Sequence, residues 1–212
     1  MSCSTRWSNR DGAVWALVLA CLIGTPAWAS TPISAEGSAS TSPATPAAPA
    51  VGELLPGAVR VGEGTLRFLG FAVYDARLLA PPGWRAEALG RTPLALELTY
   101  RRAFRGADIA RRSLEEMRRA GPIPAADEAA WLAAMQRIFP NVGPGDRITG
   151  VWQPGAGARF VFTGADGQRR ALGDVADARF AERFFGIWLA PSTSEPALRQ
   201  ALLGPSAPMA TP

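Results

Sequence analysis

The residue types that carry most enzyme chemistry are missing from this 212-residue chain. The sequence has no histidine, and all 22 of its basic residues are arginine. Without an imidazole or a lysine amine, the chain cannot build a Ser-His-Asp or Cys-His pair, a histidine-ligated metal site, a Schiff base or a P-loop. These absences exclude the common hydrolase and metalloenzyme classes, and we expect no metal and no cofactor.

The remaining groups that could do chemistry have ordinary structural explanations. The candidate carboxylate pairs are Asp108 with Glu115 and Glu116, and Asp174 with Asp177. They lie at predicted helix starts or beside arginine, where acidic residues are common for structural reasons. The Gly62-Glu63-Gly64 motif lacks the third glycine and the following helix of a phosphate loop. We therefore predict no catalytic residue.

An arginine-dense segment runs from Arg101 to Arg119. Its glutamates lie three or four residues from arginines, which is the spacing of ion pairs on one helix face. This pattern favours a solvated, internally paired surface, with an anionic-lipid or nucleic-acid surface as the alternative. The net charge of the whole chain is only +4, which is not typical of a nucleic-acid-binding protein.

The first 29 residues have the features of a removable export signal. These are Arg6 and Arg10, the apolar run Ala13 to Ile23, and Ala27-Trp28-Ala29 before Ser30. We expect cleavage after Ala29 and a bacterial periplasmic location for a mature protein without cysteine. The alternative is lipidation at Cys21. No other stretch approaches the roughly 18 apolar residues of a transmembrane helix, so none is predicted.

Composition divides the remaining chain into three parts. Residues 30–53 are rich in Ala, Pro, Ser and Thr and predict a disordered linker, as do residues 205–212 for the tail. Residues 54–204 have the size of a single domain. Strands are predicted at Thr65 to Leu79 (one long or bent strand, or two), Leu94 to Tyr100, Arg147 to Gln153, Ala158 to Thr163 and Gln168 to Leu172.

Helices are predicted at Ala107 to Ala120, Ala125 to Phe139, Ala176 to Leu189 and Pro196 to Leu203. Strands, helices, strands and helices in this order indicate an α+β fold with a largely antiparallel sheet. The third helix has an unusually wide aromatic face, formed by Phe180, Phe184, Phe185 and Trp188. Such a helix is buried on two sides, or it lines an apolar ligand cleft.

The order of these motifs resembles the chalcone isomerase-like family, in particular its exported bacterial branch. The resemblance covers about Leu55 to Gly204, and its most specific parts are Phe68 to Tyr74 and Phe185 to Leu189. It implies an open-faced β-sandwich in which a long antiparallel sheet is backed by helices, with a ligand cleft between them. The family includes plant enzymes that cyclise chalcones and members that bind fatty acids without catalysis. Both use a buried arginine for an anionic group.

Residue by residue, the resemblance does not extend to catalysis. The family's arginine follows a Gly-x-Gly motif, and Arg67 is the match here, one residue out of step, with Arg60 as the fallback. The threonine of the plant enzyme's Phe-Thr-x-x-x-Val-Tyr motif falls at Leu69. Its catalytic tyrosine has no counterpart in Gly106 to Ile109. The hydroxyl residue of the last long helix falls at Arg183.

Three hypotheses for function remain. The first is a non-catalytic binder of a small amphipathic anion such as a fatty acid, with its carboxylate on Arg67 or Arg183 and its tail among Phe71, Phe184 and Phe185. The second is an intramolecular lyase acting on an enone or phenolic substrate, with Tyr74 or Tyr100 as the available phenol. The third is an interaction module without a ligand. The predicted ligand-binding residues are Arg67, Phe71, Tyr74, Arg183 and Phe184.

Overall fold

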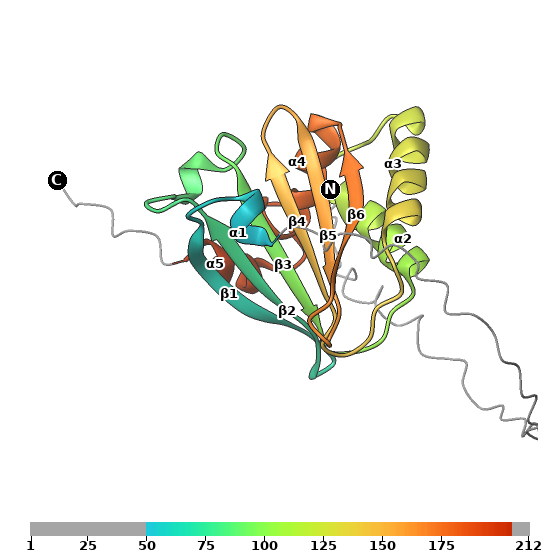
Figure 1. Ribbon diagram of the computed structural model, residues 1–212. Helices are drawn as coiled ribbons and strands as arrows, with labels where there is room; N and C mark the ends of the chain where they lie inside the picture. The colour runs from blue at the N-terminus through green and yellow to red at the C-terminus, as the bar shows by residue number, and fades with distance from the viewer. Residues whose placement is uncertain (1–49, 205–212) are drawn as a thin grey trace, which may run out of the picture. The chain divides into compact units, whose positions relative to one another are not determined.

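The computed structural model describes residues 50–204, which fall within one compact unit of the chain. These residues form a six-stranded antiparallel sheet in the order β1-β2-β3-β4-β5-β6, so every strand pairs with its neighbours in sequence (Figure 1). The predicted signal peptide, the alternatives at Ala29 and Cys21, most of the predicted linker and the 205–212 tail lie outside the described residues.

The bounds of the six strands are β1 Val59–Phe68, β2 Phe71–Ala80, β3 Leu94–Tyr100, β4 Arg147–Gln153, β5 Gly157–Thr163 and β6 Arg169–Val175. Burial alternates along part of β2, whereas the central strands β3 and β4 are buried along almost their whole length. In β2, Ala76, Leu78 and Ala80 are buried, whereas Arg77 between them is exposed. We call the face that carries these buried residues the inner face of the sheet and the opposite one the outer face.

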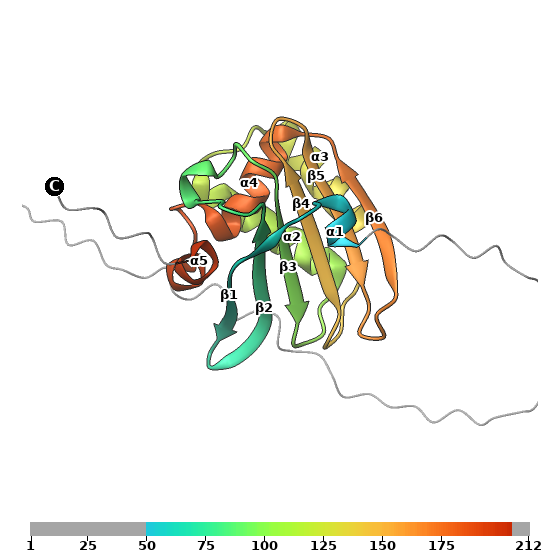
Figure 2. The ribbon, with the colours of Figure 1, turned by 60° about the vertical axis from the view of Figure 1, so that its left-hand side comes forward.

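The larger helices lie on the inner face, and a short helix lies on the outer face (Figures 1 and 2). The helices are α1 Val51–Leu54, α2 Gly106–Met117, α3 Ala125–Ile138, α4 Ala178–Leu189 and α5 Pro196–Leu203, with 3-10 turns at Ala86–Ala88 and Arg118–Ala120. α4 contacts β4 and β5, and α5 contacts β1. Two layers with one open sheet face confirm the predicted α+β fold.

The segment Thr65 to Leu79, predicted as one long or bent strand or as two, forms two strands of a hairpin, and the first of them begins six residues earlier. Thr65 to Leu79 contains a two-residue turn at Leu69-Gly70, and β1 extends back to Val59. The early part of β1 has no hydrophobic pattern because Gly62 and Gly64 face α5. A Cβ at Gly62 would collide with the backbone oxygens of Ala201 and Leu202. This Gly-x-Gly motif therefore serves helix-to-strand packing.

The linker boundary predicted at residue 53 also differs from the structure. Residues 51–54 form α1, whose neighbour Leu55 is buried against Ala95 and Val151 on the outer face of the sheet. The short apolar segment from Val51 to Leu55 thus belongs to the domain. Composition missed it because it follows directly on an Ala/Pro-rich stretch.

Candidate functional site

The aromatic face of α4 packs into the interior between helices and sheet. Phe184 contacts the rings of Phe139, Phe160, Phe180, Phe185 and Trp188, with centroid separations between 5.2 and 5.9 Å. Trp152 of β4 stacks on Phe185 at 5.3 Å. All of these side chains are buried. The wide aromatic face predicted from the sequence is therefore buried by ring-to-ring packing.

The start of α4 is fixed by its N-cap residue, Asp177. Its carboxylate accepts hydrogen bonds from the backbone N–H groups of Arg179 (2.8 Å) and Phe180 (3.0 Å), and from Nε1 of Trp131 in α3 (2.8 Å). Burial raises the pKa of Asp177, but these hydrogen bonds outweigh burial and hold it below its usual value. The cap thus ties α4 to α3 and sets the helix register that directs Phe184 and Trp188 toward the sheet.

A polar group interrupts this apolar interior at the far end of α4. The indole Nε1 of Trp188 donates a hydrogen bond to the hydroxyl of Tyr74 in β2 at 2.8 Å. The Tyr74 ring also meets Tyr100 edge-on at 6.1 Å. Within residues 50–204, Trp188 is the only hydrogen-bond partner of the Tyr74 hydroxyl, so the phenol O–H can donate to a further acceptor.

Charged side chains of α2 lie near this hydroxyl. The buried carboxylate of Glu116 forms an ion pair with Arg112, contacts Nε of Arg119 at 3.6 Å and accepts a hydrogen bond from the Ser194 hydroxyl at 2.9 Å. Ser194 belongs to the segment between α4 and α5. We call Tyr74, Arg112, Glu116, Trp188 and Ser194 the Tyr74 cluster.

The electrostatics of the Tyr74 cluster keep its phenol neutral. Burial raises the pKa of Tyr74 above its usual value, and the carboxylates of Glu195 and Glu116 add to this effect, while the Trp188 hydrogen bond and Arg112 oppose it. Burial, followed by the charge of Glu116, also raises the pKa of the Glu195 carboxyl. A neutral phenol is a hydrogen-bond donor, and the carboxylates of Glu195 and Glu116 act on it more strongly than the guanidinium of Arg112.

Arg67 and Phe71 do not lie with Phe184, contrary to the grouping predicted from the sequence. Arg67 is exposed, and its guanidinium donates to the Gly70 carbonyl of the β1–β2 turn at 3.3 Å. Phe71 is 62% exposed at the same turn. The side chain buried at this point of β1 is Leu66, one residue earlier. Arg67, next to it in the strand, therefore faces away from the interior.

The other two predicted arginines also take surface or structural positions. Arg183 of α4 is half-buried, and its guanidinium donates to the Gly121 carbonyl after α2 at 3.4 Å. Arg60, the fallback for the family arginine, is exposed and pairs with Glu63 at 3.0 Å. Of the predicted ligand-binding residues, the structure thus brings only Tyr74 and Phe184 to the interior. Trp188 contacts both.

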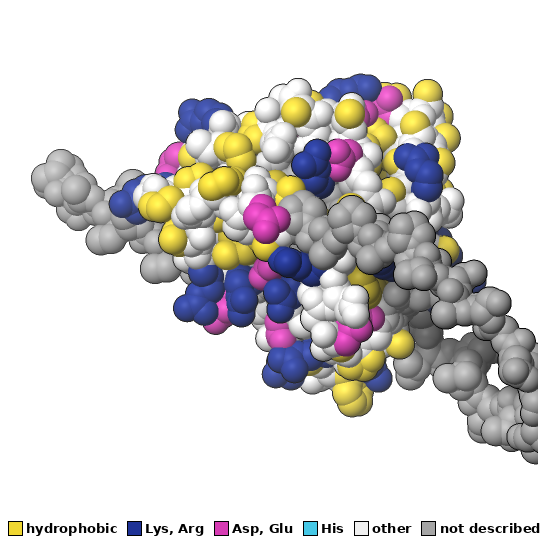
Figure 3. Space-filling view, in the orientation of Figure 1, with side chains coloured by type: hydrophobic (Ala, Val, Ile, Leu, Met, Phe, Trp, Pro, Cys, Tyr) yellow, Lys and Arg dark blue, Asp and Glu magenta, His cyan; other side chains and the backbone are white. Residues whose placement is uncertain are grey.

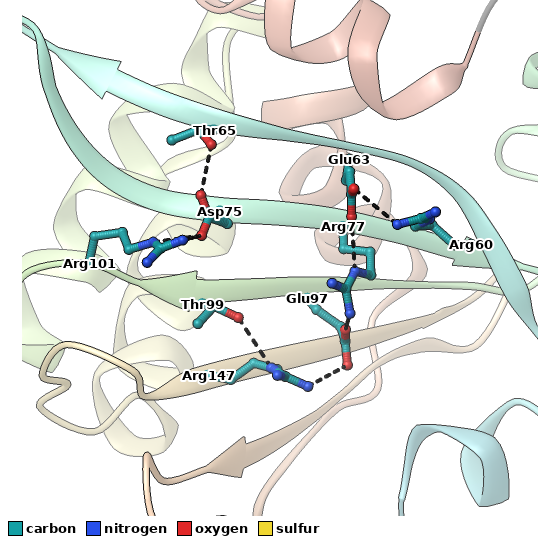
Figure 4. Close-up of polar contacts among 9 residues, drawn as sticks. All are labelled: Arg60, Glu63, Thr65, Asp75, Arg77, Glu97, Thr99, Arg101 and Arg147. Carbon is teal, nitrogen blue, oxygen red and sulfur yellow. Dashed lines mark hydrogen bonds and ion pairs between the residues drawn. The ribbon is translucent and has the colours of Figure 1, made fainter.

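The outer face of the sheet carries a network of cross-strand ion pairs (Figure 4). Arg77 contacts Glu63 at 3.4 Å and Glu97 at 3.7 Å, and Glu97 also pairs with Arg147 at 3.4 Å. Asp75 accepts from Thr65 and Arg101 farther along the same strands. Each carboxylate has a cationic partner across the strands, so the charges of this face offset one another, and the buried Glu97 is paired with two arginines.

Sequence reasoning did not predict that Glu116, with its partner Arg112, is buried. It assigned both residues to a solvated helix face because charges at helical spacing pair with one another. That pairing exists: Arg112 contacts Glu115 and Glu116. The segment after α4, however, covers part of this face and buries Glu116. This burial follows from tertiary packing and cannot be read from helical spacing. The one signal in the sequence is the polar pair Thr193-Ser194, which separates two apolar helices.

Comparisons with known proteins assign the fold to a family. The chain belongs to the chalcone isomerase-like family, whose model matches residues 62–204. An uncharacterised protein of Haemophilus influenzae is 29% identical over 144 residues, covering 68% of this chain and 67% of that protein. The crystal structure of an Arabidopsis thaliana fatty-acid binding protein matches with a TM-score of 0.50 at 10% identity, covering 70% of this chain and 87% of that one.

Residues 50–204 contain neither a cluster of metal-ligating side chains nor a membrane-spanning helix. No group of three or more acidic, cysteine or histidine side chains is placed to hold a metal ion in this part of the chain. None of its helices has both the length and the hydropathy to cross a bilayer.

Proposed function

We propose that this protein is a non-catalytic binder of a small amphipathic anion such as a fatty acid, and that it acts in the bacterial periplasm after removal of residues 1–29. The single observation that carries the proposal is the hydroxyl of Tyr74. It is a neutral donor that Arg112 influences electrostatically, it accepts a hydrogen bond from Trp188, and through Trp188 it adjoins the aromatic interior around Phe184. The fatty-acid binding protein with the same fold supports the ligand class.

In this proposal the ligand's anionic group accepts hydrogen bonds from the Tyr74 hydroxyl and the Arg112 guanidinium. Glu116 now contacts Arg112, so the ligand carboxylate competes with an internal carboxylate for this arginine. Glu116 retains partners during the exchange because Arg119 and Ser194 also contact it. Guanidinium-to-carboxylate exchange of this kind keeps the charges paired throughout.

The apolar tail lies along α4 in this proposal. Trp188 contacts the Tyr74 hydroxyl, and Phe184 packs on Trp188. An acyl tail that follows these two rings replaces their contacts with each other by contacts between ring and tail. Because these rings are packed against one another, both must change rotamer before a tail enters. We therefore expect slow ligand exchange and copurification of ligand with the protein.

Native mass spectrometry of protein isolated from the periplasm of its own cells, followed by organic extraction, tests this function. We expect a mature chain that begins at Ser30 with a copurified fatty acid, and a loss of at least about tenfold in bound ligand in Tyr74→Phe. Arg60→Gln is the matched control because Arg60 is an exposed residue of the outer face. A protein that carries no ligand and takes up none from a fatty-acid panel would refute the proposal.

A further inference from the structure

The tip of the β1–β2 hairpin exposes two large apolar side chains. Leu69 is 78% exposed and Phe71 is 62% exposed, and the only other large hydrophobic side chain exposed to a similar degree among residues 50–204 is Val59, at the opposite end of the same hairpin. In the space-filling view, hydrophobic surface projects at the lower end of the domain, with arginine side chains on both sides (Figure 3). Neither residue has a role in the core.

The turn conformation shows that a leucine at this position is not favourable for folding. Leu69 (φ 49°) and Gly70 (φ 83°) both have positive φ, and Leu69 is the only non-glycine residue with positive φ among the described residues. Two-residue hairpin turns of this type favour Asn-Gly, because asparagine tolerates the left-handed region and a branched apolar residue does not. Leucine here costs conformational energy and exposes apolar surface, so the fold does not account for it.

Arginine side chains lie beside the apolar residues of the tip. Arg67 bonds to the turn carbonyl of Gly70, and the guanidinium of Arg102 lies over the Phe71 ring at 5.1 Å from its centroid. β3 pairs with β2, and its last residue lies opposite Tyr74. Arg101 and Arg105 are exposed on the segment that follows β3. Asp75 pairs with Arg101. Cations beside protruding apolar side chains are complementary to an anionic interface with an apolar interior.

We infer that the β1–β2 hairpin tip docks onto an anionic lipid surface, with Leu69 and Phe71 inserted among the acyl chains and Arg67 and Arg102 at the headgroups. Charge complementarity selects this occupant over a second copy of the chain, because two identical tips would bring like charges together. The inference is independent of ligand binding at the Tyr74 cluster. Phe71 at the tip lies three residues before Tyr74 in β2, a distance of about 10 Å in an extended strand.

Cosedimentation of the ligand-free domain with vesicles tests this inference. We expect binding to vesicles of phosphatidylglycerol and phosphatidylcholine, and weaker binding by at least about tenfold to phosphatidylcholine alone. Leu69→Asn combined with Phe71→Thr should lower the partition coefficient by at least about tenfold, since both apolar anchors are lost. Asparagine suits the turn, so this variant should fold as well as the parent protein. Val59→Thr is the matched control at the other end of the hairpin.

The arginines supply the second arm of the test. Arg67→Gln with Arg102→Gln should weaken binding several-fold to anionic vesicles only, and Arg60→Gln should leave it unchanged. Failure of the parent protein to bind anionic vesicles would overturn the inference, as would equal binding by the tip variant. Concentration-dependent self-association that the tip variant abolishes, without vesicle binding, would assign the tip to a second copy of the chain and overturn it too.

Discussion

Replacing Phe184 with alanine distinguishes a packed interior from the wall of an open ligand cleft. The Phe184 ring is 6% exposed and touches five other aromatic rings at centroid distances of 5.2 to 5.9 Å. Truncation of a buried phenylalanine costs about 3–5 kcal/mol, combining lost transfer free energy with the cavity left behind. Because its neighbours are themselves large rings that cannot collapse into the space, we expect about 4 kcal/mol for Phe184→Ala.

Urea unfolding of the ligand-free domain, followed by far-ultraviolet circular dichroism, measures this loss. Phe71→Ala is the matched control, since it removes the same ring from an exposed site and should change the free energy of unfolding by no more than about 1 kcal/mol. A loss below about 1.5 kcal/mol for Phe184→Ala would refute the packed interior, because a ring that lines an open cleft has few contacts to lose.

Two further predictions concern the phenols and the first strand. The chain has two tyrosines, and burial raises the pKa of both Tyr74 and Tyr100 above the ordinary 10.0. Ultraviolet titration should therefore show no tyrosinate in the folded domain at pH 10. The contribution of the two phenols to the free energy of unfolding should be fully present below pH 10 and should fall as the pH rises above it. Half-ionisation near pH 10 without unfolding would contradict the assignment. Gly62→Ala should lower the free energy of unfolding by at least about 2 kcal/mol in the same urea assay, because the added Cβ meets the α5 backbone. Gly52→Ala is the control: it has open space around it and should cost less than about 0.5 kcal/mol. Equal effects would argue against the close approach of α5.

Local patterns in the sequence were sufficient for most of the fold. Leu94 to Tyr100 alternates with a period of two, and β3 has those bounds. Proline and glycine ended the helices close to the observed residues, as at Pro196–Leu203. The hairpin at Leu69-Gly70 was harder, because leucine is not a turn residue and both sides of the turn are apolar.

The candidate site was less predictable because it depends on which side of an element meets another. Tyr74 and Phe184 lie in the interior as expected for aromatic residues of regular elements, whereas Phe71, which the same reasoning grouped with Phe184, is exposed at the turn. Arg67 was misplaced because the resemblance aligned an arginine near the expected position, while the structure buries Leu66 and leaves Arg67 at the turn. Glu116 was overlooked because its burial comes from a segment almost 80 residues later in the chain, at Ser194.

The topology of the sheet also has a consequence for how the chain folds. β1 and β2 are joined by a two-residue turn, β2 and β3 by residues 81–93, and β4 to β6 by short turns, whereas β3 and β4 are joined through residues 101–146, which contain α2 and α3. The halves β1 to β3 and β4 to β6 can each form from contacts that are local in sequence, but the β3–β4 ladder must close a loop spanning residues 101–146. Because of this loop-closure entropy, we expect the β3–β4 pairing to be a late step of folding. The two three-stranded halves would then form first and be joined when α2 and α3 dock onto the inner face.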